Sequence, residues 1–144
     1  MALILTVDDQ YNVREVLVRW IKRAGHETLE AESANAALDV MGTQPVAVVF
    51  SDVQMPGRDG LWLTAELRKR YPTTAVVLAT QVSTVAPQIT MQAGVLAYLV
   101  KPFSQESVMR ALETALSWHT NAVVAGPRPE DTPERLQEWL DSLQ

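Results

Sequence analysis

The sequence of 144 residues contains no cysteine and only two histidines. The absence of cysteine excludes a disulfide framework, a thiolate metal site and a cysteine nucleophile. His26 and His119 lie far apart in the sequence, which argues against a histidine-rich zinc site. Any metal site in this protein is therefore expected to use oxygen ligands.

Long apolar runs and an excess of positive charge are also missing. No run reaches the roughly 18 residues that a membrane span requires, and the N-terminus lacks the basic stretch and long apolar core of a signal peptide. Twelve Lys and Arg stand against seventeen Asp and Glu, a net charge of −5. Without a basic stripe, this segment is not expected to bind nucleic acid directly. We expect a cytoplasmic protein without membrane association.

The residues that are present suit one globular domain followed by a tail. Hydrophobic residues make up 47% of the chain and charged residues 20%, which is typical of a folded soluble domain. After Ala125, one glycine and three prolines fall within eight residues and indicate a linker. A short helix with an apolar stripe is expected beyond it, formed by Leu136, Trp139, Leu140 and Leu143. We predict a domain over residues 1–121, with the linker and short amphipathic helix over 122–144.

Short apolar runs alternate with helical patterns along the predicted domain. The expected strands are 3–7, 27–31, 46–50, 75–79 and 97–100, and the expected helices are 11–24, 34–41, 61–70, 84–93 and 104–119. Strands that are apolar throughout need cover on both faces. Right-handed crossovers then leave few topologies. The pattern predicts an α/β fold, with a doubly wound five-stranded parallel sheet and helices on both faces.

Polar side chains follow four of the five expected strands. Asp8 and Asp9 follow the first strand, Asp52 the third, Thr80 the fourth and Lys101 the fifth. In open α/β sheets, ligands bind outside the carboxyl ends of the strands. These five side chains are therefore expected to meet at one edge of the sheet.

This combination of residue types indicates phosphoryl-transfer chemistry. Three converging carboxylates repel one another unless some are protonated or a cation is bound. Oxygen ligands without His or Cys favour Mg²⁺, and the ammonium of Lys101 and the hydroxyl of Thr80 suit phosphoryl oxygens. A carboxylate nucleophile completes such a site. The sequence has neither GxxxxGK[ST] nor GxGxxG, so it shows no nucleotide-binding loop.

Each residue alone has a more ordinary interpretation. An Asp pair after a strand commonly caps a helix, and Asp52 before a Pro/Gly loop is commonly a turn residue. A lone Lys101 would be a solvated surface charge, and Tyr98 within a strand would be a core residue. Independent coincidences at four strand ends are rare, and this favours a shared site for the residues at those ends.

In order and spacing, these residues resemble the receiver domain of bacterial two-component response regulators. The matching motifs cover residues 3 to about 119 and are Asp8-Asp9, Asp52-Val53-Gln54-Met55-Pro56 with Gly60, Thr80, Tyr98 and Lys101-Pro102-Phe103. The resemblance implies a flavodoxin-like sheet with strand order 2-1-3-4-5. It also implies a cis peptide bond before Pro102, because proline lowers the free-energy cost of the cis isomer.

The resemblance implies a chemical role for the acidic residues. Asp52 would accept a phosphoryl group from the phosphohistidine of a sensor histidine kinase or a phosphotransfer protein. The protein ligands of Mg²⁺ would be Asp8, Asp9, Asp52 and the backbone carbonyl of Gln54. The domain would catalyse its own phosphorylation and slow dephosphorylation, while acting mainly in signalling.

The remaining motif residues would bind the phosphoryl group and report its presence. Lys101 and Thr80 would hold the phosphoryl oxygens, and Thr80 and Tyr98 would move together as a switch. The signal would reach the face formed by the fourth helix, the fifth strand and the fifth helix. No charged residue occurs from Tyr71 to Val100, so we expect this face to contact a second copy or an output segment.

Two other functions fit the sequence less well. The first is an interaction module that keeps the fold without being phosphorylated. Loss of Asp9, Asp52 or Lys101 would favour it, and all three are present. The second is a hydrolase with Asp52 as its nucleophile, which would need a substrate pocket or cap that the short loops do not offer.

Overall fold

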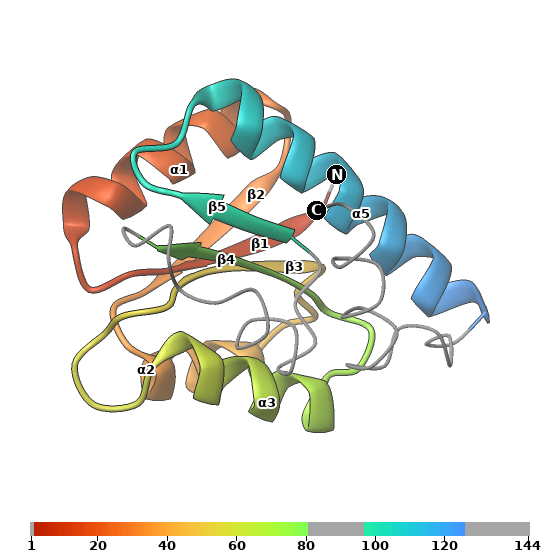
Figure 1. The fold of residues 1–144 in the computed structure, drawn as a ribbon. Helices are drawn as coiled ribbons and strands as arrows, with labels where there is room; N and C mark the ends of the chain where they lie inside the picture. The colour runs from red at the N-terminus through yellow and green to blue at the C-terminus, as the bar shows by residue number, and fades with distance from the viewer. Residues whose placement is uncertain (1, 81–96, 126–144) are drawn as a thin grey trace, which may run out of the picture.

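Five parallel strands form the centre of the molecule (Figure 1). They are β1 (Leu3–Val7), β2 (Glu27–Ala31), β3 (Val48–Asp52), β4 (Ala75–Thr80) and β5 (Ala97–Val100). Their order in the sheet is β2-β1-β3-β4-β5, which confirms the predicted topology. The structure is a computed structural model that describes residues 2–80 and 97–125.

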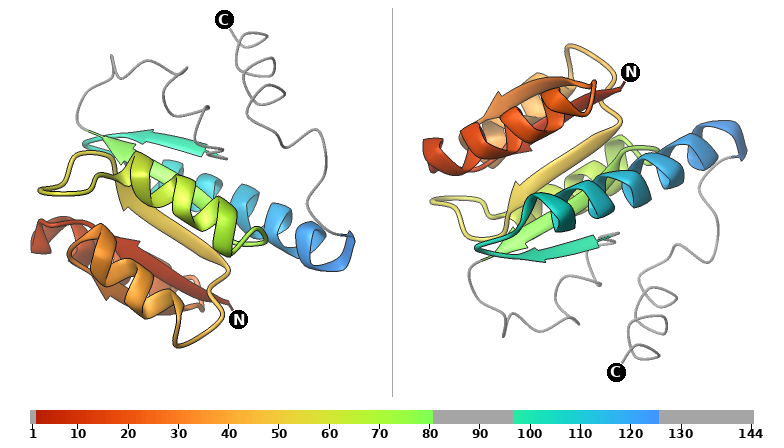
Figure 2. Two further views of the ribbon diagram at one scale, coloured as in Figure 1. Left: turned by 90° about the horizontal axis from the view of Figure 1, so that it is seen from below. Right: turned by 90° about the horizontal axis from the view of Figure 1, so that it is seen from above.

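Helices cover both faces of this sheet. They are α1 (Tyr11–Arg23), α2 (Ala34–Met41), α3 (Gly60–Arg70) and α5 (Gln105–Ala125). α1 and α5 lie on one face, and α2 and α3 lie on the other (Figure 2). The helix expected at 84–93 falls outside the described residues. No helix in the described part of the chain is long and apolar enough to cross a membrane.

The sheet separates two apolar cores. One core lies beneath α1 and α5, and its fully buried members include Ile4, Phe50, Val77, Ile21 and Val108. The other lies beneath α2 and α3, and its fully buried members include Leu5, Val49, Val76, Leu63 and Leu67. Neighbouring residues of each strand enter opposite cores because side chains alternate across a sheet. Each large side chain that is fully buried stabilises the fold by roughly 1.5–3 kcal/mol.

Side-chain caps fix where two of the helices begin. The Ser33 hydroxyl accepts a hydrogen bond from the Ala36 amide at the start of α2. The Asp59 carboxylate accepts one from the Trp62 amide at 2.8 Å at the start of α3. Such caps satisfy amides that have no partner within the helix. The cap at Asp59 also sets the end of the loop that leads from β3 to α3.

The last helix is longer than the sequence pattern indicates. It was expected to end near His119, but α5 continues to Ala125, so residues 122–125 of the expected linker are helical. The helix meets no glycine or proline before Gly126, and Ala122 is buried. The remainder of the predicted tail, including the short amphipathic helix, lies outside the described residues.

Candidate functional site

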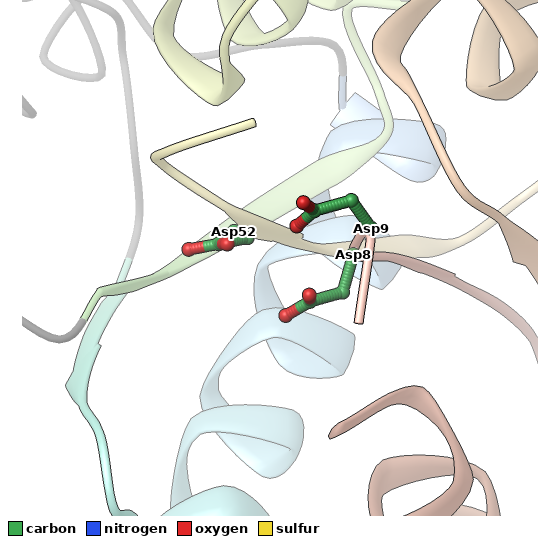
Figure 3. A group of neighbouring side chains, drawn as sticks. All are labelled: Asp8, Asp9 and Asp52. Atoms are coloured by element: carbon green, nitrogen blue, oxygen red, sulfur yellow. The ribbon is translucent and has the colours of Figure 1, made fainter. Parts of the chain in front are cut away.

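The carboxyl ends of β1 and β3 bring three aspartates together. Asp52 is the last residue of β3, and Asp8 and Asp9 directly follow β1, which pairs with β3 in parallel. One carboxylate oxygen from each residue lies within 4.8 Å of the other two (Figure 3). Asp8 and Asp52 are buried, whereas Asp9 is exposed. The acidic cluster expected from the strand ends is therefore present.

Lys101 brings a positive charge into this cluster from the end of β5. Its Nζ lies 2.8 Å from Oδ2 of Asp8 and 3.5 Å from Oδ2 of Asp52, and its side chain is 8% exposed. The peptide bond between Lys101 and Pro102 is cis, the isomer that the resemblance implies. Asp8 and Asp52 thus share the charge of this ammonium, and with Asp9 the described cluster keeps an excess of negative charge.

Asp8 is fixed through each of its polar groups. Its amide donates to the Ala31 carbonyl at 3.1 Å, and its Oδ1 accepts from the Gln10 amide at 2.8 Å. Its Oδ2 accepts from Lys101. Its carbonyl oxygen accepts from Nη1 of Arg14 at 2.5 Å. Asp8 therefore has a defined position before any ligand arrives.

Asp52 is held less tightly and is harder to ionise. Its Oδ1 accepts one long hydrogen bond, 3.4 Å, from the Gln54 amide. Burial raises the pKa of the Asp52 carboxyl above 3.8, and the Asp8 charge raises it further, while Lys101 and the Gln54 amide act in the opposite direction. An additional positive charge would favour the ionised form of Asp52.

Gly60 lets the start of α3 approach the backbone of Asp52. The Gly60 amide donates to the Val53 carbonyl at 3.0 Å. A Cβ added at Gly60 would lie 2.2 Å from the Asp52 carbonyl oxygen and 3.1 Å from the Val53 Cα. The absence of a side chain at this position thus determines how the loop after Asp52 folds over the strand end.

The remaining residues of the expected site are placed less completely. Thr80 ends β4 and pairs with Val100 of β5, but its side chain lies outside the described part of the structure. Tyr98 is half-buried in β5, and burial raises the pKa of its hydroxyl above 10.0. The switch and the contact face that were expected to include helix 84–93 fall largely on residues 81–96, outside the description.

The donor set fits a divalent cation with a preference for oxygen. Asp8, Asp9 and Asp52 offer carboxylate oxygens from three directions, and the described cluster contains no imidazole or thiolate. Hard ligands of this kind suit Mg²⁺ rather than zinc or copper. The excess of negative charge gives such a cation an electrostatic reason to bind.

A comparison with known protein families identifies the family in which this arrangement occurs. The sequence model described as "Response regulator receiver domain" matches residues 4–113. The chain belongs to this family. As a receiver domain of a two-component response regulator, it carries its acidic cluster at the strand ends where the family resemblance places it.

Relatives of this receiver domain include much longer proteins. It is 37% identical over 137 residues to the response regulator protein FleR of Pseudomonas aeruginosa, a match that covers 94% of this chain and 28% of FleR. It is 32% identical over 128 residues to the DNA-binding transcriptional regulator NtrC of Klebsiella pneumoniae, covering 88% of this chain and 27% of NtrC. The chain thus spans a little over a quarter of these relatives.

Solved structures of other response regulators share the fold. The response regulator TrrA of Thermotoga maritima, solved in complex with Mg²⁺ and BeF, has a TM-score of 0.75 and 30% identity; the match covers 81% of this chain and all of TrrA. The chemotaxis response regulator CheY4 of Vibrio cholerae has a TM-score of 0.76 and 28% identity, over 81% of this chain and 99% of CheY4.

Proposed function

We propose that Asp52 is the phosphoacceptor of this receiver domain, and that its phosphorylation depends on Mg²⁺. The donor would be the phosphohistidine of a sensor histidine kinase or a phosphotransfer protein. The observation that carries the proposal is the buried Asp52 carboxylate, which lies beside two further carboxylates and the Lys101 ammonium. Its support comes from membership of the receiver family and from the likeness to TrrA, which was solved with Mg²⁺ and BeF.

The proposed step is a direct transfer to the carboxylate. An oxygen of Asp52 forms a bond to phosphorus, while the bond between phosphorus and the imidazole nitrogen of the donor breaks. The imidazole leaves with the electron pair and takes up a proton. Lys101 balances negative charge on the phosphoryl oxygens as the group arrives, because its ammonium already lies 3.5 Å from the Asp52 carboxylate. Thr80, at the end of the neighbouring strand, would donate a hydrogen bond to the same oxygens.

Asp8, Asp9, Asp52 and the backbone carbonyl of Gln54 would hold the metal ion. When bound, Mg²⁺ neutralises charge on the carboxylates and on the phosphoryl oxygens. The residues of the chain supply the remaining requirements. The fixed Asp8 anchors one side of the site, and the Gln54 amide orients the Asp52 carboxylate.

Phosphorylation can be tested with a small phosphodonor and without the kinase. The protein is incubated with acetyl phosphate, with and without Mg²⁺, and its intact mass is measured. We expect a mass gain of one phosphoryl group in the presence of Mg²⁺ and none in Asp52→Asn. Asp39→Asn is a matched control because Asp39 is an exposed carboxylate on α2, away from the strand ends. That variant should react like the wild type.

The alternative function, an interaction module without phosphorylation, makes the opposite forecast. If neither acetyl phosphate nor a phosphorylated histidine kinase modifies the wild type, or if Asp52→Asn is modified to the same extent, the phosphoacceptor proposal is wrong. Under the phosphoacceptor proposal, Thr80 and Tyr98 would transmit the change to a second copy or an output segment.

A further inference from the structure

Arg14, on the second turn of α1, is the residue that connects the acidic turn to the edge of the sheet. Its side chain is only 13% exposed although α1 faces solvent at this end. Its Nη1 donates to the Asp8 carbonyl at 2.5 Å, and its Nε donates to Oε1 of Glu30 in β2 at 3.2 Å. The guanidinium also lies 5.7 Å from the centre of the Tyr11 ring. One side chain thus binds the turn, the strand and the start of its own helix.

The backbone of Asp8 is held to β2 through both its amide and its carbonyl. Its amide bonds directly to the Ala31 carbonyl, while its carbonyl bonds through Arg14 to Glu30. That carbonyl belongs to the peptide bond that joins Asp8 to Asp9. Arg14 therefore fixes the plane from which the Asp9 side chain starts, whereas Asp9 is itself exposed.

We infer that Arg14 is a positioning residue for the divalent-cation site, acting through the Asp8–Asp9 peptide and not through contact with the ion. The inference rests on the proposed metal site. Groups that orient metal ligands from the second layer typically change metal affinity by about 10–100-fold when removed. The planar guanidinium suits this role, because its fork reaches two acceptors at once in fixed geometry.

The sign of the effect separates positioning from simple electrostatics. Arg14 carries a positive charge near a cation site, so its charge alone opposes the binding of Mg²⁺. If only charge mattered, Arg14→Ala would strengthen Mg²⁺ binding. If Arg14 positions the Asp8–Asp9 peptide, the same substitution weakens it.

The test is a Mg²⁺ titration without any phosphodonor, in which binding is monitored through backbone amide chemical shifts. We expect the dissociation constant for Mg²⁺ to rise by about tenfold in Arg14→Ala. Arg14→Lys keeps the charge but loses the fork, so we expect a smaller rise. Arg19→Ala is the matched control: it removes the same charge from the same helix, and among the described residues the ion pair of Arg19 is with the exposed Glu15. Its dissociation constant should stay unchanged or fall slightly.

A general loss of stability must not be mistaken for loss of positioning. Ile21→Val lowers the stability of the core under α1 without touching the turn, and should bind Mg²⁺ like the wild type. Unchanged or tighter binding in Arg14→Ala, or equal weakening in Arg14→Ala and Ile21→Val, would overturn the inference while leaving the proposed function in place. Failure of the wild type to bind Mg²⁺ would overturn both. Should Arg14→Ala fail to fold, the Mg²⁺ dissociation constants of Arg14→Lys and Arg19→Ala are compared instead. A higher constant in Arg14→Lys than in Arg19→Ala supports the inference, and an equal or lower one overturns it.

Discussion

The two ends of the β-sheet satisfy their polar groups in different ways. At the amino ends, Nδ1 of His119 lies 2.7 Å from the Thr73 carbonyl, and the Thr74 hydroxyl donates to the Val46 carbonyl at 2.8 Å. Each of these side chains has a backbone partner of matching type. At the carboxyl ends, three carboxylates lie close together, and the ammonium of Lys101 contacts two of them, Asp8 and Asp52. At the amino ends these polar side chains have hydrogen-bond partners, whereas the carboxyl ends carry an excess of negative charge.

This difference separates polar groups that build the fold from those that cost it stability. A buried group with a matched partner contributes to folding or is neutral. Like charges gathered in a buried site oppose folding, and they persist where a ligand or a reaction requires them. Substitutions at the carboxyl ends should therefore change stability in both directions and alter Mg²⁺ binding, whereas those at the amino ends should only reduce stability modestly.

Removal of the ammonium should have the largest effect. In Lys101→Met the buried carboxylates of Asp8 and Asp52 lose their shared partner, and we expect a loss of about 3 kcal/mol in the free energy of unfolding without divalent ions. Urea unfolding in the presence of a chelator measures it. Lys69→Met, which changes an exposed lysine, should lose well under about 1 kcal/mol. Equal losses in the two variants would show that the Lys101 ammonium does not stabilise the buried carboxylates.

Filling the space at Gly60 should have the next largest effect. The added Cβ of Gly60→Ala would meet the Asp52 carbonyl at 2.2 Å, so the backbone beneath the acidic site must move, at about 2 kcal/mol. Gly42→Ala is the control, because the nearest atom to its added Cβ is 3.5 Å away. Thermal unfolding should separate the two variants; matching melting temperatures would mean that the loop after Asp52 yields freely.

Neutralising Asp52 should have the opposite sign. Without divalent ions, Asp52→Asn should raise the free energy of unfolding by about 1 kcal/mol at neutral pH, because it removes a carboxylate that loses hydration on burial and is also repelled by Asp8. The raised pKa of Asp52 sets the pH dependence. The wild type loses stability as the pH rises through that pKa, so the advantage of Asp52→Asn should vanish below pH 3.8 and grow above it. A variant less stable than the wild type at neutral pH would contradict this.

A substitution at the amino ends of the strands should have the smallest effect on stability. His119→Ala removes the bond to the Thr73 carbonyl, and we expect a loss of at most about 1 kcal/mol. Mg²⁺ affinity should be unchanged, since His119 lies at the opposite end of the sheet from the carboxylates. Calorimetric unfolding and a Mg²⁺ titration measure the two quantities. A weaker Mg²⁺ affinity would show that the two ends are coupled.

The strands and the acidic cluster could be predicted because their signals are local in the sequence. A run such as 46–50 is apolar throughout, and Asp52 comes two residues after it, so topology alone brings Asp52 to Asp8. The contacts of Arg14 could not be predicted in this way. Its partners Asp8 and Glu30 belong to different elements, and an arginine on an exposed helix gives no sign of the direction it takes. Its place one turn into the helix after the acidic pair is the one clue the sequence holds.

The extension of α5 escaped prediction for a related reason. Its continuation depends on burial of Ala122 against the rest of the domain, which a weak apolar pattern after His119 does not reveal. The expectation that Lys101 would lie near the aspartates did not depend on packing, and its Nζ does lie beside Asp8 and Asp52. It used only the position of the lysine directly after a strand.

The most direct test of the central proposal identifies the residue that carries the phosphoryl group. The protein is incubated with Mg²⁺ and acetyl phosphate, the acyl phosphate is reduced with borohydride, and the peptides are sequenced by mass spectrometry. We expect the reduced product, homoserine, at position 52 and nowhere else, with none formed when Mg²⁺ is chelated. Reduction at Asp8 or Asp9, or no reduced residue anywhere in the chain, would contradict the assignment of Asp52 as the phosphoacceptor.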